Sequence, residues 1–191
     1  MTPPEVRINL YSLVSYLPDP LAGFLDSLRC ELVPSCSVHA HVTVLPPRPL
    51  PVNGEAAWRH ICALAPDFPC FDVELTEVRL FPVSGVLYME IGKGVEQLRE
   101  MHAVLNTGIL KASEVFEYHP HITLAQDIGT LRVEELMQQA RQRWSDFPHP
   151  RTFRVKAVTF VQSTAVGSWV DLGSCQLGTG ETRLLETVRA Q

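Results

Sequence analysis

A chain of 191 residues with a formal net charge of −5 is long enough for one sizeable hydrophobic core. Its apolar fraction of 46% and charged fraction of 19% are typical of a globular protein. The acidic balance argues against broad binding to DNA or long RNA, which needs basic stripes, but it permits a nucleotide held in a locally cationic cleft.

Neither a membrane span nor a targeting segment is evident. No stretch approaches the roughly 20 apolar residues that cross a bilayer, and the first residues, Met-Thr-Pro-Pro-Glu, lack the basic start of a signal peptide. The cysteines are scattered, odd in number and without CxxC spacing, so we expect buried reduced thiols rather than zinc ligands or a disulfide framework. We therefore expect a cytoplasmic protein with no membrane partner. These cysteines are Cys30, Cys36, Cys62, Cys70 and Cys175.

The first half of the chain alternates between strand and helix signals. β-branched and aromatic residues predict a strand over 6–16, with Tyr11 and Leu10 on opposite faces. Asp19 and Pro20 then supply the cap and the first residue of a helix whose leucines recur at helical spacing. The later elements expected in this half are a strand that stops at Pro46-Pro47, a helix capped by Asn53 and closed by Pro66, and a strand over 71–81.

The second half repeats much of this order. We expect strands over 86–91 and 117–125, a helix over about 94–110 between them, and a further helix capped by Thr130. A strand over 153–161, a turn, a last strand over 168–172 and a short amphipathic tail after Gly178 complete the pattern.

This repetition predicts an α+β, bilobal duplicated fold, with two antiparallel sheets flanked by helices around a central cleft. The segment 71–92 aligns loosely with 153–174, which supports a duplication. The repeat of about 80 residues is too long for a solenoid. We therefore interpret 1–191 as a single domain built from quasi-repeats over about 6–82 and 83–175.

A short segment that occurs twice carries most of the functional information. Residues 37–46 read SVHAHVTVLP and residues 117–126 read EYHPHITLAQ, so each copy contains His-x-His-x-Thr. Alternate side chains of a strand lie on one face, which groups two imidazoles and a hydroxyl in each copy and sends the intervening apolar residues into the core. The two His-x-Thr pairs are His41 with Thr43 and His121 with Thr123.

Two imidazoles that face each other across a cleft form a general acid–base pair. The unperturbed pKa of histidine is near 6.5, so at neutral pH one ring can be neutral while the other is protonated. Phosphodiester cleavage needs one group that takes a proton from water and another that gives a proton to the leaving oxygen, each worth roughly 10²–10⁴-fold. The threonine hydroxyls could hydrogen-bond the non-bridging phosphate oxygens.

The paired motifs resemble those of the 2H phosphoesterase superfamily, and in particular its 2′-5′ RNA ligase and cyclic phosphodiesterase branch. The resemblance implies a phosphodiesterase without metal or other cofactor that acts on 2′,3′-cyclic or related phosphates of nucleotides or RNA 3′-ends, with 2′-5′ RNA ligation as a further activity. It implies that His41 and His121 are the acid–base pair and that Thr43 and Thr123 anchor phosphate. Many relatives carry a basic residue just after the second motif, where this chain has Gln126.

Four more residues are candidates for substrate contact. Arg48 follows the first motif closely and could supply cationic character on that side of the cleft. Tyr11, Tyr88 and Trp169 lie in expected strands, where an aromatic ring could stack a nucleobase or could simply fill the core.

The remaining histidines of the motifs, His39 and His119, leave the interpretation open. They could support the catalytic pair, line the rim of the cleft and contact substrate, or lie exposed near the strand starts. Together with His41 and His121 they could also form a four-histidine metal site, although neither segment contains a carboxylate and the threonines would then be unexplained. A second alternative is an RNA-end binding protein that keeps the cleft without useful turnover.

Overall fold

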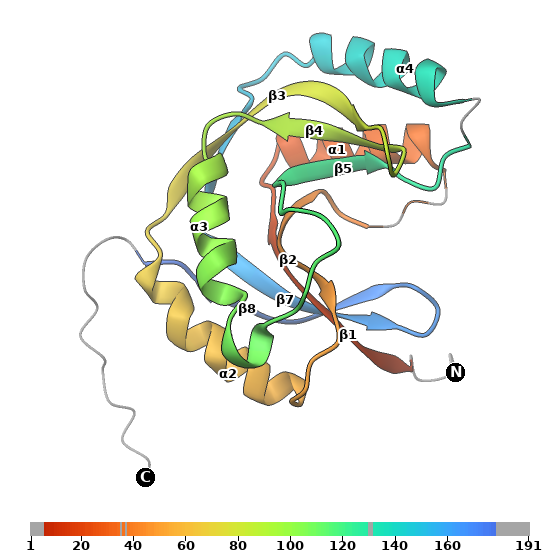
Figure 1. The fold of residues 1–191 in the computed structure, drawn as a ribbon. Helices are drawn as coiled ribbons and strands as arrows, with labels where there is room; N and C mark the ends of the chain where they lie inside the picture. Colours follow the sequence, from red (N-terminus) through yellow and green to blue (C-terminus); the bar gives the residue numbers. More distant parts are fainter. Residues whose placement is uncertain (1–5, 35, 37, 130–131, 179–191) are drawn as a thin grey trace, which may run out of the picture.

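The computed structural model describes residues 6–34, 36, 38–129 and 132–178 (Figure 1). Thr130 and the tail beyond Gly178, for which a helix cap and an amphipathic turn are expected, lie outside this part of the chain. The helices are α1 (Leu21–Leu32), α2 (Gly54–Leu64), α3 (Val95–Leu105) and α4 (Val133–Ser145), with short 3-10 helices η1 (Ala65–Asp67) and η2 (Gly108–Leu110). The strands are β1 (Arg7–Tyr16), β2 (His41–Arg48), β3 (Phe71–Phe81), β4 (Val86–Ile91), β5 (His121–Ala125), β6 (Thr152–Val155), β7 (Ala157–Thr164) and β8 (Trp169–Gln176).

Two four-stranded antiparallel sheets form the frame, which confirms the predicted fold class. The first sheet has the strand order β2-β1-β7-β8 and the second has the order β5-β4-β3-β6. The strand that begins with His41 and the strand that begins with His121 therefore occupy the same place in the two sheets, at one edge of each. The third strand of each sheet comes from the other half of the sequence, because β3 pairs with β4 and β7 pairs with β1.

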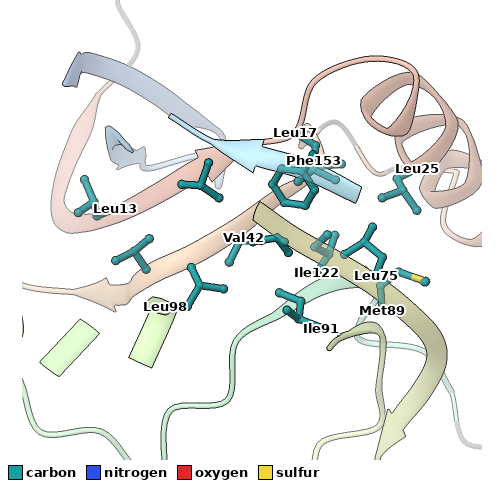
Figure 2. Close-up of a cluster of buried hydrophobic side chains, with 14 of the residues drawn as sticks. Leu13, Leu17, Leu25, Val42, Leu75, Met89, Ile91, Leu98, Ile122 and Phe153 are labelled. Carbon is teal, nitrogen blue, oxygen red and sulfur yellow. The ribbon is translucent and has the colours of Figure 1, made fainter. Parts of the chain in front are cut away.

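One hydrophobic cluster joins the two sheets. Val42 from β2 and Ile122 from β5 are fully buried in it, together with Leu75 and Met89 of the second sheet and Leu13 of the first (Figure 2). The burial of Val42 and Ile122 follows from the alternation of side chains along a strand, because the residues on either side of each lie on the opposite face. The two lobes thus share a core instead of having one each.

The helices cover both sheets and are also exchanged between the halves. α1 and α4 contact each other and pack against β5 and β3 of the second sheet, whereas α3 packs against β2 and α2 against β8 of the first (Figure 1). Helix α2 begins as expected, because the side chain of Asn53 accepts a hydrogen bond from the backbone N–H of Ala56 at 2.8 Å. Within the described part of the chain, none of the helices is long and apolar enough to cross a bilayer.

Several expected boundaries differ from the structure. The strand predicted over 153–161 is two strands, because the chain breaks at Lys156 and passes from the second sheet (β6) to the first (β7). The strand predicted to stop at Pro46-Pro47 runs on to Arg48, which an edge strand permits since one side of it needs no ladder hydrogen bonds.

Helix α1 also begins later than predicted. Its first residue is Leu21 and Pro20 is the capping residue, while the carboxylate of Asp19 accepts a hydrogen bond from the N–H of Gly23 at 3.0 Å. The expected helix over about 94–110 is shorter as well, since α3 ends at Leu105 and is followed by the separate turn η2.

The expectation of buried cysteines is wrong, and the expectation of reduced thiols is wrong for two of the five. Cys62 of α2 and Cys175 of β8 form a disulfide across 113 residues of sequence. The packing of α2 against β8 brings them together, a contact that sequence spacing does not encode. The remaining thiols are only partly covered or exposed: Cys30 is exposed, and Cys36 and Cys70 are half-buried.

Candidate active site

The two motif histidines are held in the same way on equivalent strands. His41 is the first residue of β2, and its Nδ1 lies 2.7 Å from the carbonyl oxygen of His39. His121 is the first residue of β5, and its Nδ1 lies 2.7 Å from the carbonyl oxygen of His119. A carbonyl oxygen can only accept a hydrogen bond, so Nδ1 carries the proton in both rings. This tautomer leaves Nε2 of each imidazole as the nitrogen that can take up or release a proton.

The predicted quartet converges on one cleft. His41, Thr43, His121 and Thr123 all line a cavity of about 1070 Å³ that has walls from both sheets. The hydroxyl residue of each pair lies two positions after the histidine on the same strand face, as the alternation requires. The cleft therefore holds two imidazoles and two hydroxyls contributed symmetrically by the two edge strands.

The electrostatics of this cleft favour neutral imidazoles. Burial lowers the pKa of His41, while its hydrogen bond to the carbonyl of His39 opposes the shift, and the charges of Arg29 and His121 add to it. Burial likewise lowers the pKa of His121 against the opposing hydrogen bond to the His119 carbonyl. Since each ring in the pair disfavours a second positive charge nearby, a state with one neutral and one protonated imidazole is preferred to a doubly protonated one.

The other two histidines of the motifs are placed differently from each other. His39 precedes β2, its side chain is 78% exposed, and its Nδ1 lies 2.8 Å from Oδ2 of Asp26. His119 lines the cleft, with its Nε2 3.1 Å from Oε1 of Glu90. The four imidazoles do not form one cluster, and no group of three or more His, Cys, Asp or Glu side chains in the described residues is arranged to hold a metal ion.

The aromatic candidates separate into one that lines the cleft and two that are buried. Trp169 lines it. Tyr88 is buried and stacked on Phe81, with ring centroids 3.9 Å apart, and makes an edge-to-face contact with His121. Tyr11, for which base stacking and a place in the core were both open, is buried and stacked on Phe160, because both faces of β1 are covered at its centre.

Arg48 is committed to protein partners. Its side chain is only 4% exposed, and its Nη2 lies 2.6 Å from Oε1 of Glu114. The other donors bond to the carbonyl oxygens of Pro46 and Leu110 and to the side-chain oxygen of Asn106. The guanidinium thus anchors the loop before β5 to the end of β2, and its charge is offset by Glu114.

Three residues of the site went unrecognised in the sequence. Tyr16 donates a hydrogen bond to Asp171 at 2.7 Å and makes an edge-to-face contact with His41. Tyr118 donates to the carbonyl of Thr43 at 2.8 Å and so ties the loop before β5 to the first motif. Arg29 lines the cleft from the buried face of α1. Only Arg29 left a local signal, since it follows Leu25 by four residues and so lies on the apolar stripe of its helix.

Comparison with known proteins finds relatives in sequence and in structure. A sequence model of the 2′-5′ RNA ligase superfamily matches residues 17–167, which include both His-x-Thr pairs. A Bacillus licheniformis protein provisionally named a phosphoesterase is 24% identical over 122 residues, which cover 62% of this chain and 72% of that protein.

Solved structures show the same fold. The apo form of E. coli LigT superposes with a TM-score of 0.61 at 16% identity and covers 90% of this chain and 99% of its own. LigT complexed with 3′-AMP gives a TM-score of 0.60 at 17% identity and covers 88% of this chain and 97% of its own. With the match to the sequence model extending over most of its length, the chain belongs to the 2′-5′ RNA ligase superfamily of 2H phosphoesterases.

Proposed function

We propose that this protein is a metal-independent phosphodiesterase that hydrolyses 2′,3′-cyclic or related phosphodiesters of nucleotides and RNA 3′-ends. The observation that carries the proposal is the matched pair of imidazoles at the starts of β2 and β5. Each ring is oriented by a carbonyl two residues earlier, and both line the same cleft as the two threonines.

Hydrolysis needs two proton transfers, and the pair can supply both. Nε2 of one neutral imidazole takes a proton from water as the water oxygen bonds to phosphorus. The bond from phosphorus to one ribose oxygen breaks, and Nε2 of the other, protonated imidazole gives its proton to that oxygen. The hydroxyls of Thr43 and Thr123 donate hydrogen bonds to the non-bridging oxygens, where charge builds up in the transition state.

The family suggests that the 3′-oxygen leaves and that a 2′-phosphate remains. When the 5′-hydroxyl of an RNA replaces water as the attacking group, the same transfers yield a 2′-5′ phosphodiester, so ligation requires no additional catalytic group. The cleft of about 1070 Å³ is large enough for a nucleotide. LigT, which shares the fold, has been crystallised with phosphate and with 3′-AMP, which supports a nucleotide phosphate as ligand.

Turnover of 2′,3′-cyclic mononucleotides, followed by phosphorus NMR, tests the proposal. His41→Ala and His121→Ala should each lower the rate by roughly 10²–10⁴-fold while far-UV circular dichroism shows a folded protein. His60→Ala is the matched control, because His60 lies on α2 and away from the cleft. Near-normal turnover in either cleft variant would show that the acid–base assignment is wrong. A 3′-phosphate as sole product would contradict the expected leaving group, and binding without turnover would favour the RNA-end binding protein.

A further inference from the structure

Arg29 is a buried cation for which the described residues provide no anion. Its side chain is 6% exposed on the last turn of α1, and it lines the cleft that holds the two His-x-Thr pairs. Among the residues that the structure describes, neither Nε nor Nη1 of its guanidinium has a hydrogen-bond partner. Burying a charge without a counter-ion or hydrogen bonds costs free energy of folding, so native structures nearly always provide a partner for it.

Comparison with Arg48 shows what Arg29 lacks. The two arginines are almost equally buried and line the same cleft. The guanidinium of Arg48 bonds to a carboxylate, a side-chain amide and two carbonyl oxygens, which together neutralise and satisfy it. The corresponding acceptors are missing around the buried Nε and Nη1 of Arg29 in the described part of the chain, and the residue lines the cleft, so its charge is uncompensated at the cleft wall.

The chemistry of a guanidinium identifies the kind of ligand. Its planar set of N–H donors fits the oxygens of a phosphate, and its charge does not depend on pH in the working range. Arg29 and His41 line the same cleft, and the charge of Arg29 lowers the pKa of His41. The segment after the second motif, Ala125-Gln126-Asp127, brings no cation to the cleft.

We infer that Arg29 is the anion-binding residue of this cleft and that it donates hydrogen bonds to the phosphate oxygens of the substrate. The inference deepens the proposed function and rests on it for the identity of the anion. Arg29 holds the phosphate from the α1 side, while the threonines approach it from the two edge strands. In the absence of ligand, the protein retains an unpaired buried charge at a cost to its own stability.

Binding of inorganic phosphate and thermal unfolding in phosphate-free buffer test the inference together. Arg29→Met keeps the length and apolar character of the side chain and removes its charge. It should weaken phosphate binding by about 10- to 100-fold, the range expected for lost hydrogen bonds to a charged group. It should also raise the unfolding midpoint of the phosphate-free protein by a few degrees. If Arg29 only stabilised the fold, Arg29→Met would instead lower the unfolding midpoint.

Arg99→Met is the matched control. It removes a positive charge from an exposed ion pair with Glu96 on α3, away from the cleft, and should leave phosphate binding unchanged. Arg29→Lys should restore part of the affinity, since it restores the charge without the planar set of donors.

The outcomes separate this inference from the proposed function. The inference is overturned if the Arg29→Met variant and the wild type bind phosphate equally well, or if the wild type shows no measurable binding. A lower unfolding midpoint in the variant would also overturn it. Each of these results counts even if the wild type hydrolyses cyclic nucleotides. Phosphate binding that depends on Arg29 in a protein that hydrolyses none of them would overturn the proposed function and leave the anion-binding role intact.

Discussion

Replacing Glu114 with glutamine should destabilise the fold strongly, because it leaves the guanidinium of Arg48 buried beside a neutral amide. The two side chains are 4% and 17% exposed and lie 2.6 Å apart. Removing one partner of a buried ion pair costs about 3–5 kcal/mol. The amide oxygen of glutamine can still accept one hydrogen bond, so we expect about 3 kcal/mol, near the lower end of that range.

For a chain of this length, each kcal/mol shifts the unfolding midpoint by roughly 2–4 °C, so Glu114→Gln should lower it by about 6–12 °C. Urea unfolding followed by circular dichroism gives the free energy directly. Glu77→Gln is the matched control, because Glu77 and Arg79 are also 2.6 Å apart but are both more than half exposed. Solvent screens that pair, and the unfolding midpoint should not change measurably.

A double variant tests the reasoning further. If burial of an unpaired charge causes the loss, Arg48→Met combined with Glu114→Gln should be more stable than the sum of the two single changes predicts. A loss below about 1 kcal/mol in Glu114→Gln, or strict additivity in the double variant, would refute the account of Arg48 as a charge that depends on Glu114.

Three further predictions follow from the local geometry. Because burial lowers the pKa of His41 and His121, the unfolded chain binds more protons below about pH 6.5, and the free energy of unfolding of the ligand-free protein should fall as the pH drops below that value. The dependence of the unfolding free energy on pH should be weaker when both histidines are replaced by alanine. An equal dependence would contradict the lowered pKa values of His41 and His121. Asn53→Ala should cost about 1 kcal/mol in urea unfolding, since it removes the cap of α2, and a change near zero would show that the cap contributes little. His39→Ala keeps the carbonyl that orients His41, so turnover should fall by less than about tenfold, whereas a loss as large as that of His41→Ala would place the His39 side chain in the reaction.

Part of the site could be predicted because its pattern is local. The alternation of polar and apolar residues around His41 and His121 determines which side chains share a face, and two copies of it predicted the four residues that line one cleft. Residues whose role depends on distant partners could not be placed in this way. Arg48 seemed available to a substrate because nothing nearby in the sequence offsets its charge, while Glu114 approaches it from another segment in the folded chain.

Pairing between strands explains most of the remaining differences. The hydrogen bonds of a sheet join backbone groups, which are the same in every residue, so a sequence shows that a segment is a strand without showing its neighbours. The exchange of β3 and β7 between the two halves, and the break at Lys156 that sends β6 and β7 to different sheets, are therefore visible only in the tertiary structure.

By itself, the sequence determined the α+β class, most of the helices and strands, and the four side chains that carry the proposed chemistry, since each depends on the order of residues within a short segment. The tertiary structure decided what surrounds those four. It brought the two edge strands to one cleft, joined Cys62 to Cys175 and neutralised Arg48. It also left Nε and Nη1 of Arg29 buried with no hydrogen-bond partner among the described residues. The physical reason is that burial and charge compensation depend on the atoms that pack around a side chain, and most of these come from segments far away in the sequence.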